Sequence, residues 1–418
     1  MKSINKSHLI YYTALAVPFV IVIIILNGLK DQFPAFHGSD EFIYHFPVIL
    51  KFARDFPYLD LRYYDSATTP LFHILFMLVG KIIGLELFKL RLMNCIISFI
   101  AIIFLFRLFF TQVQHSILKS FIFSLLFLLS PYFFPGCFIL LTDNLGILFC
   151  IISLIFIYKF YQTQSLNSLA IGALFMCGAE LTRQSYIWLS MIDFFLLAVL
   201  RIEAKRRIIG ILIVLISVIP LFLFIMFWHA LTPPAFQEHH LSNMIVSTKS
   251  FVFMISLIGL YSIFLDNQFF ISLFKLKFRE LISYLITTFI GFLFLFVFPV
   301  SYNYGDDGFL WRISSKLPTI LNNTGILFWF LFPLGLLEIH STIVTNSKNK
   351  LPFLLLLTSI LVLINSKLLY QKYFDPIALL FLFLTYRKDT VSSKSQYIGW
   401  AFLLIGFISY HFIRIYLS

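Results

Sequence analysis

Long apolar runs recur along the whole sequence and limit its possible folds more than any other feature. Most are about 16 to 22 residues long, near the length that an α-helix needs to cross the ~30 Å apolar core of a bilayer. Of the 418 residues, 60% are hydrophobic and only 12% are charged. A soluble core of this size would need far more polar residues to cover its surface. The sequence therefore predicts an all-α polytopic membrane protein, with residues 1–418 forming a single integral membrane domain.

The apolar runs predict about thirteen transmembrane helices. The first run follows Lys2 and Lys6. It is too long for a signal peptide and no small-residue cleavage site follows it, so we expect it to remain as a span. Residues 70–85, PLFHILFMLVGKIIGL, are interpreted instead as an amphipathic helix at the extracytoplasmic surface. The expected spans are residues 8–29, 92–110, 117–134, 138–159, 168–181, 186–200, 207–228, 250–266, 280–300, 323–340, 351–366, 374–386 and 396–416.

Lysine and arginine residues set the predicted orientation of these spans. With the N-terminus inside, every inside segment carries at least one cation, as the positive-inside rule requires. The net charge of +12 therefore reports membrane topology, and we expect no nucleic acid partner. Residues 30–91 then form the first extracytoplasmic loop, which includes the most acidic part of the chain. The inside cations are Lys2, Lys6, Arg107, Lys119, Lys159, Arg201, Lys205, Arg206, Arg207, Lys275, Lys277, Arg279, Lys348, Lys350, Arg387, Lys388 and Lys394.

Two adjacent acids, Asp40 and Glu41, lie shortly after the first span, in the stretch HGSDEFIYHFP. One interpretation is a solvated pair in a loop. The other is a catalytic acid held at the membrane face, where ionisable groups are functional candidates because burying them is costly. Neighbouring residues on a helix point about 100° apart, so only one of the two carboxylates would face a given site.

Two further acids lie in segments predicted to be outside. Asp65 belongs to YYDSATTP, where Thr68 or Thr69 is expected to cap the following helix, with Pro70 in the first turn. Asp143 belongs to LTDNLG, near the start of an apolar span. There it would gain from the helix dipole, or it would bind a substrate hydroxyl.

Two cations are also predicted to lie outside. Arg183, in TRQSYIW, offers a rigid fork of donors suited to phosphate, or it extends to the interface without a specific partner. Lys372, in LLYQKYFDP, binds phosphate or belongs to an aromatic belt at the interface. No Gly-rich phosphate loop, H-E-x-x-H or G-x-S-x-G motif appears, so a nucleotide-driven enzyme is not indicated. We expect no cofactor, and the sequence does not indicate a metal site.

The order of these motifs resembles the GT-C superfamily of membrane glycosyltransferases, and more narrowly the dolichyl-phosphate-glucose-dependent alpha-1,2-glucosyltransferases. That family carries a D-E pair with a nearby H and P, then W-D-P-x-I-T-T-x-P, Y-T-D and F-R-Q-T-N-I-x-W segments. The likeness is colinear over residues 37–190, and Tyr64 stands where the family has Trp. The corresponding residues are Asp40, Glu41, His45 and Pro47; Tyr64 to Pro70; Leu141 to Asp143; Thr182 to Trp188; and Asp306, Asp307, Trp311 and Arg312.

The resemblance implies an inverting enzyme that moves a hexose from a polyprenyl-phosphate sugar to a glycan or lipid-linked acceptor. It implies Asp40 as the catalytic base, Glu41 as the alternative base and Asp65 as a second acidic group. The reaction would occur on the extracytoplasmic or ER-lumenal face, in the plasma membrane of a bacterium or the ER membrane of a eukaryote. The substrate-binding residues that it implies are Asp143, Arg183, Gln184, Arg312 and Lys372.

Other classes of membrane protein share part of this pattern. A lipid or glycan transporter or flippase would also have many spans, but it tends to place charges at the bilayer midplane and to show repeated halves. We find no convincing internal repeat, and the acids lie toward one membrane face. An envelope glycan polymerase or ligase would share the outside site and the lipid-linked substrate, and the sequence does not separate it from a transferase.

Overall fold

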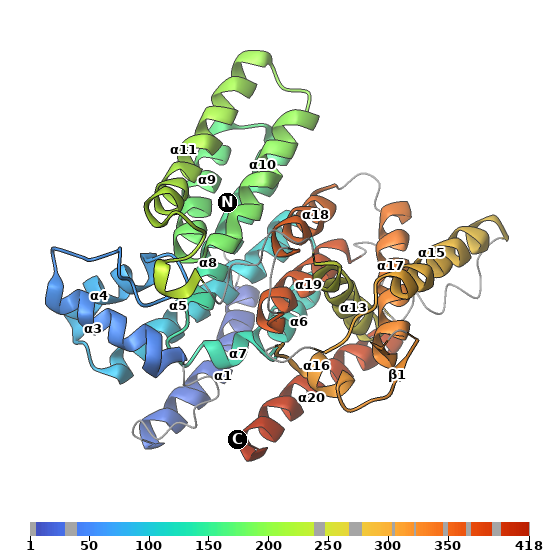
Figure 1. Cartoon of the computed structure of the whole chain (residues 1–418), viewed down its shortest axis with the longest axis horizontal. Coiled ribbons are helices and arrows are strands. Elements are labelled where there is room, and N and C mark those ends of the chain that lie inside the picture. Colours follow the sequence, from blue (N-terminus) through green and yellow to red (C-terminus); the bar gives the residue numbers. More distant parts are fainter. Residues whose placement is uncertain are drawn as a thin grey trace. The chain divides into compact units, whose positions relative to one another are not determined.

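The structure is a computed structural model in which almost every element is a helix (Figure 1). It describes residues 6–29, 40–237, 247–266, 278–302, 306–321, 323–345, 350–364, 369–386 and 394–417. Seven of the described helices are long and apolar enough to cross a membrane, and the predicted all-α polytopic membrane fold is confirmed. The sequence predicts one domain, and the structure groups its residues into two compact units. Unit 1 is Met1–His240 with Ser409–Ser418, and unit 2 is Leu241–Ile408.

Unit 1 contains the N-terminal helices and most of the predicted site. The C-terminal part of the last helix, from Ser409 onward, also belongs to it, and the His411 ring there donates to the Leu129 carbonyl oxygen at 3.0 Å. The elements of unit 1 are α1 (Lys6–Leu29), the π-helix η1 (Glu41–His45), α3 (Phe46–Asp55), α4 (Leu71–Ile83), α5 (Leu87–Arg107), the π-helix η2 (Leu108–Gln112), α6 (Ile117–Leu128), α7 (Phe133–Gly136), α8 (Thr142–Thr163), α9 (Leu166–Thr182), the 3₁₀ turn η3 (Gln184–Ile187), α10 (Trp188–Val199), α11 (Ala204–Trp228) and the 3₁₀ turn η4 (Pro234–Phe236).

Unit 2 contains the remaining helices and a short β-hairpin. Two glycines allow its central helices to approach closely, because a Cβ on Gly259 or Gly335 would collide with the backbone of the opposite helix. The elements of unit 2 are α13 (Thr248–Leu265), α15 (Phe278–Val297), α16 (Phe309–Ser314), β1 (Thr319–Ile320), antiparallel β2 (Thr324–Gly325), α17 (Ile326–Thr345), α18 (Leu351–Leu363), α19 (Gln371–Thr385) and most of α20 (Lys394–Leu417).

Each predicted span overlaps a helix of the structure, and seven of these helices are long and apolar enough to cross a membrane. The span predicted at 117–134 is interrupted, because α6 ends at Leu128 and a turn separates it from α7. The stretch interpreted as a surface helix is α4, which has 13 residues and is therefore about 20 Å long. It ends at Gly84, whose φ of +110° a residue with a Cβ rarely adopts. Several of the cations that set the predicted orientation lie outside the described residues, namely Lys2, Lys275, Lys277, Lys348, Arg387 and Lys388.

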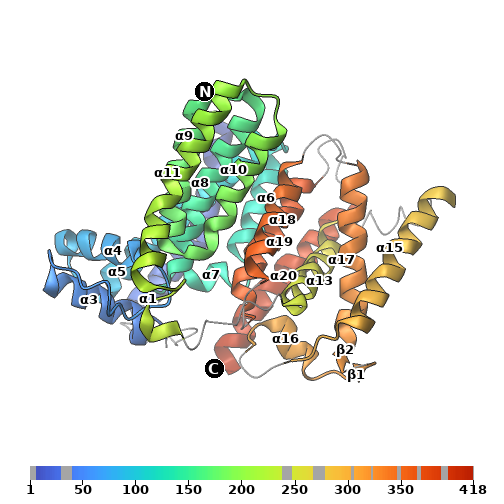
Figure 2. The same cartoon turned by 45° about the horizontal axis from the view of Figure 1, so that its top comes forward.

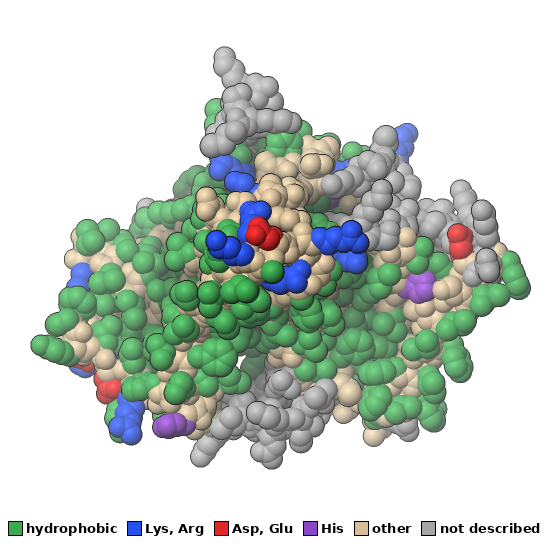
Figure 3. Space-filling model, turned by 90° about the horizontal axis from the view of Figure 1, so that it is seen from above, with side chains coloured by type: hydrophobic (Ala, Val, Ile, Leu, Met, Phe, Trp, Pro, Cys, Tyr) green, Lys and Arg blue, Asp and Glu red, His purple; other side chains and the backbone are tan. Residues whose placement is uncertain are grey.

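Helices α8 to α11 form a bundle (Figures 1 and 2). The two ends of this bundle differ in charge. Helix α8 has 22 residues, so it is about 33 Å long and matches the thickness of a bilayer core. The junctions α8–α9 and α10–α11 lie at one end and expose Lys159, Arg201, Lys205 and Arg206. Figure 3 is seen from above this end of the bundle and shows Lys and Arg side chains gathered there. The starts of α8 and α10 and the end of α9 lie at the other end, so the bundle separates the predicted inside cations from Asp143.

Candidate functional site

The two adjacent acids occupy different environments at the start of η1. Asp40 is half-buried, whereas the Glu41 side chain is fully buried. Glu41 accepts two hydrogen bonds from the Arg91 guanidinium, at 3.0 and 2.6 Å, and a third from the Leu140 backbone N–H at 2.8 Å. Three donors on one carboxylate compensate for the loss of water around it. Glu41 is therefore not part of a solvated loop, and it joins η1 to α5 and to the segment before α8.

Helix α5 holds that segment from a second point. The Asn94 side-chain amide, one turn beyond Arg91, donates to the carbonyl oxygens of Gly136 and Ile139, each at 2.7 Å. Sequence reasoning missed this role of α5. The visible signal is the presence of Arg91 and Asn94 in FKLRLMN, at the start of an otherwise apolar helix. A buried cation in such a helix requires an anionic partner.

Asp65 lies in an exposed turn that is fastened to the end of α9. Its side chain is 58% exposed and pairs with Lys51 at 3.1 Å. The Thr69 hydroxyl donates to the Glu180 carbonyl oxygen at 2.8 Å, and the Gln184 amide donates to the Ala67 carbonyl oxygen at 2.8 Å. The predicted capping role of Thr68 or Thr69 is wrong: the cap residue of α4 is Pro70, and no side chain caps it. The hydroxyl of Thr69 is directed to another helix instead.

Asp143 and Arg183 form an ion pair at the same end of the bundle. Asp143 lies in the first turn of α8, and Arg183 lies between α9 and η3. Their side chains are 16% and 11% exposed, so both keep limited access to solvent. Arg183 therefore does not extend into solvent without a partner, and Asp143 has both an arginine and a helix N-terminus to stabilise its charge.

These contacts bring together predicted site residues that are far apart in the sequence. Glu41 reaches the segment before Asp143, Asp143 pairs with Arg183, and Gln184 reaches the turn that carries Asp65. All of them belong to unit 1 and lie at the end of the bundle opposite the cation cluster. The arrangement supplies carboxylates that can accept a proton or bind hydroxyls, and a guanidinium that can bind phosphate.

A buried hydrogen-bonded chain of three aromatic side chains also connects this region. The Tyr64 hydroxyl contacts His73 Nδ1, and His73 Nε2 contacts His45 Nδ1 at 2.9 Å. Burial lowers the pKa of His73 well below its ordinary value, with the nearby His45 adding to the effect, and burial raises the pKa of Tyr64. Sequence reasoning left His45 without a role, because no local spacing connects it to His73.

The remaining predicted residues, Arg312 and Lys372, belong to unit 2. Arg312 pairs with Asp307 at 2.9 Å, and both side chains are substantially exposed. Backbone hydrogen bonds join Asp307 to Leu369 and Gln371, which places Asp307 beside the start of α19. The Lys372 ammonium lies 5.7 Å from the ring centre of Tyr370 and 5.5 Å from that of Tyr373. Two cations predicted to bind phosphate therefore lie near one end of α19.

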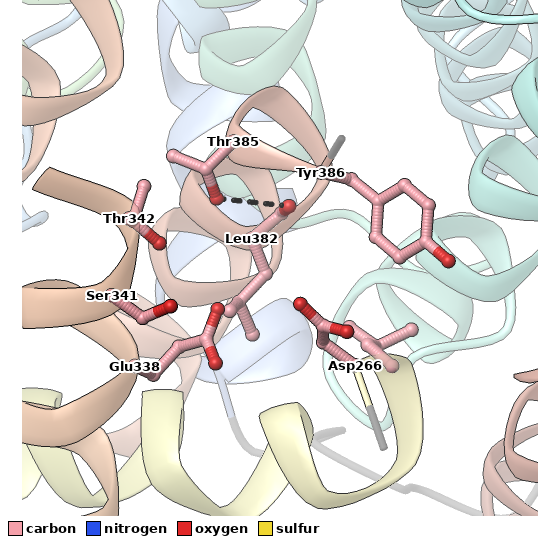
Figure 4. A pocket seen from close by; sticks show the side chains of 8 residues that line it. Asp266, Glu338, Ser341, Thr342, Leu382, Thr385 and Tyr386 are labelled. Atoms are coloured by element: carbon pink, nitrogen blue, oxygen red, sulfur yellow. Dashed lines mark hydrogen bonds between the residues drawn. The ribbon is translucent and has the colours of Figure 1, made fainter. Parts of the chain in front are cut away.

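Unit 2 also contains a polar pocket, at the opposite end of α19 from Arg312 and Lys372 (Figure 4). Its cavity of about 10 Å³ has room for about one water molecule or a monatomic ion. The pocket lies where α13 and α19 end, at the predicted inside face, and contains none of the predicted site residues. Its lining residues are Leu265, Asp266, Glu338, Ser341, Thr342, Leu382, Thr385 and Tyr386.

Among the described residues, no group of three or more His, Cys, Asp or Glu side chains is placed to hold a metal ion.

Comparisons with known proteins give one weak structural likeness. No protein-family model matches the sequence, and no curated protein matches it significantly. The crystal structure of ArnT from Cupriavidus metallidurans in the apo state aligns with 94% of this chain and 77% of that chain, with 14% identity and a TM-score of 0.42.

Proposed function

We propose that the protein is an inverting GT-C glycosyltransferase. It transfers a hexose from a polyprenyl-phosphate sugar to a glycan or lipid-linked acceptor on the extracytoplasmic face. The observation that carries the proposal is the contact network of unit 1, which gathers the Asp40-Glu41, Asp65, Asp143 and Arg183 segments at one end of α8–α11. These segments are the ones whose order resembles the superfamily, and they lie opposite the exposed cations that the positive-inside rule assigns to the inside.

The chemistry needs a base at the acceptor and a cation at the leaving phosphate. Asp40 takes the proton from the acceptor hydroxyl while the oxygen of that hydroxyl forms a bond to the anomeric carbon. The bond from that carbon to the phosphate oxygen breaks, and the polyprenyl phosphate departs with the electron pair. Asp40 is assigned as the base because it is half-buried, whereas Glu41 is fully buried and already accepts three hydrogen bonds. Glu41 then holds the turn that carries Asp40.

The other residues bind and orient the two substrates. Arg183 binds the donor phosphate, and Asp143 accepts a hydrogen bond from a sugar hydroxyl once phosphate competes for its arginine. Asp65 is a second acidic group at the acceptor, in a turn fastened by Gln184. Arg312 and Lys372 supply further positive charge for phosphate. The sugar arrives already activated on its lipid, so the site needs no nucleotide loop.

The decisive experiment incubates membranes containing the protein with a panel of radiolabelled polyprenyl-phosphate sugars and follows which label reaches a glycan or lipid acceptor. Asp40→Asn is expected to abolish transfer while the protein inserts and accumulates normally. Glu86→Gln is the matched control, because Glu86 is an exposed acid at the end of the same loop. Full activity in Asp40→Asn would exclude Asp40 as the base, and transfer from no donor in the panel would contradict the transferase.

One observation favours a transporter as the second candidate. Asp193 lies inside α10, is fully buried, and its carboxylate oxygens have no hydrogen-bond partner among the described residues. An ionisable group within a predicted span is typical of a translocation path. A transporter would move a labelled lipid-linked sugar across vesicle membranes unchanged, and Asp193→Asn would stop that movement. Transfer of the label to an acceptor that persists in Asp193→Asn would exclude this candidate.

A further inference from the structure

The Tyr64–His73–His45 chain joins three segments that local sequence does not connect. His45 is the last residue of η1, Tyr64 lies in the turn next to Asp65, and His73 lies in the first turn of α4. All three side chains are buried, with 7%, 1% and 0% of their surface exposed respectively. Hydrogen bonds in π-helical geometry run from residue i to i+5, so His45 lies one turn beyond Asp40. The chain thus runs from the turn of Asp40 to the turn of Asp65.

His73 is the link on which the chain depends. A neutral imidazole has one donor and one acceptor nitrogen, so His73 must donate to one neighbour and accept from the other. Burial keeps His73 neutral by lowering its pKa. Because each bond fixes the tautomer of the next ring, the three side chains are ordered as one unit. A replacement for His73 must therefore offer both a donor and an acceptor.

Packing holds the ends of the chain in place. The Tyr64 ring stacks between Phe52 and Trp228, with ring centres 5.7 and 6.4 Å away. The His45 ring contacts Phe72 edge to face. On the other side of η1, the ion pair of Glu41 fixes the same turn to α5. Asp40 is thus carried by a turn that is fastened from two directions.

We propose that Tyr64, His73 and His45 are positioning residues of the transferase site, and that their hydrogen-bonded chain holds Asp40 at the acceptor hydroxyl by fixing the turn of Asp40 relative to the turn of Asp65. The inference rests on the proposed function. It goes beyond it by assigning three residues that touch neither substrate. General-base catalysis depends on such placement, since a displacement of about 1 Å costs about 10²-fold in rate.

The test compares variants that keep or remove the hydrogen bonds. Tyr64→Phe keeps the stacked ring and loses the hydroxyl, and His73→Phe loses both ring nitrogens. His73→Gln keeps one donor and one acceptor, and Tyr58→Phe is the control at a tyrosine that is 87% exposed. The kcat, the KM for the polyprenyl-phosphate sugar and the melting temperature are measured for each full-length variant. We expect Tyr64→Phe and His73→Phe to lower kcat by about 10- to 100-fold with an unchanged donor KM. His73→Gln should restore most of the activity, and Tyr58→Phe should match the wild type.

The outcomes separate this inference from the function on which it rests. A wild type that transfers no sugar would overturn the transferase, and the positioning role with it. An active wild type whose kcat is indifferent to Tyr64→Phe would overturn the positioning role only. The same conclusion would follow if His73→Gln lost as much activity as His73→Phe, because the amide keeps the bonds. If His73→Phe fails to fold, Tyr64→Phe decides the question, since its ring still fills the space between Phe52 and Trp228.

Discussion

Two arginine–carboxylate pairs of unit 1 have the same chemistry and different surroundings. The Glu41–Arg91 pair is buried, at 0% and 5% side-chain exposure, and a backbone N–H completes the set of donors to Glu41. The Asp143–Arg183 pair is 16% and 11% exposed and lies at the bundle end that we assign to substrates. Burial distinguishes the two pairs: the first is shielded from any ligand, whereas the second retains the access to solvent that its proposed exchange of partner for a phosphate or a hydroxyl requires. Breaking the first pair should therefore affect folding, and breaking the second should affect activity.

The largest expected effect comes from breaking the buried pair. Arg91→Met leaves the Glu41 carboxylate buried without its cation, which is expected to cost about 3–5 kcal/mol of stability. The measurement is thermal unfolding of the detergent-solubilised protein, followed by tryptophan fluorescence. Arg54→Met is the control, since its pair with Asp55 is exposed. The double variant Glu41→Leu with Arg91→Met should recover much of the loss, because it removes the unpaired charge. An unchanged melting temperature in Arg91→Met would contradict the structural role.

The second largest effect is expected on catalysis, from breaking the Asp143–Arg183 pair. Arg183→Met removes the cation proposed for the leaving phosphate and should lower kcat/KM for the donor by about 10²–10³-fold. Stability should fall less than in Arg91→Met, since the side chains of the pair that it breaks are more exposed than those of Glu41 and Arg91. Arg183→Lys should keep part of the activity, because an ammonium carries the charge without the two-pronged geometry. Collapse of the fold in Arg183→Met, with normal kinetics in the surviving protein, would place this pair in the same class as Glu41–Arg91.

The comparison also shows what the sequence can predict. Hydropathy predicts a helix at each expected span, and seven of those helices are long and apolar enough to cross a membrane. The distribution of Lys and Arg between the loops predicts that Asp143 and Lys159 lie on opposite sides of the membrane, at the two ends of α8. The acids and Arg183 could be found because a charge in an apolar chain is conspicuous. Helix geometry predicts that Asp40 and Glu41 lie in different environments, because only one of two neighbouring residues can face a given site.

The partners of these residues could not be predicted. Arg91 lies 50 residues from Glu41, and its pairing depends on how α5 packs against η1. His73 lies 28 residues from His45, and the sequence identifies it only as part of an amphipathic surface helix. Thr69 was expected to cap α4 because local rules favour that position, but a tertiary hydrogen bond to α9 took its hydroxyl. Long-range polar contacts leave no periodic signal in a single sequence.

A smaller effect is expected where the site is fastened by one neutral hydrogen bond. Thr69→Val keeps the side-chain shape and loses the bond to the Glu180 carbonyl oxygen, at a cost of about 1 kcal/mol. The turn that carries Asp65 should become less ordered, so the KM for the acceptor should rise by a few-fold with little change in the donor KM. Thr163→Val is the control, because its hydroxyl bonds within α8 at the opposite end of the bundle. Equal effects in both variants would show that the Thr69 contact is not specific to the site.

The smallest expected effect is a pH dependence that belongs to the hydrogen-bonded chain. Burial lowers the pKa of His73, so the folded protein keeps this ring neutral at pH values where the unfolded chain, with a pKa of about 6.5, binds a proton. Above about pH 6.5, His73 is neutral in both the folded and the unfolded protein, so it does not make stability depend on pH. As the pH falls below about 6.5, the unfolded chain binds a proton at His73 that the folded protein does not, and the free energy of unfolding decreases. The measurement is the difference in melting temperature between the wild type and His73→Gln from pH 7.5 to pH 5. The wild type should lose more stability than the variant on acidification. Parallel curves would mean that His73 is not held neutral in the folded protein, and that it does not act as one donor and one acceptor in the chain.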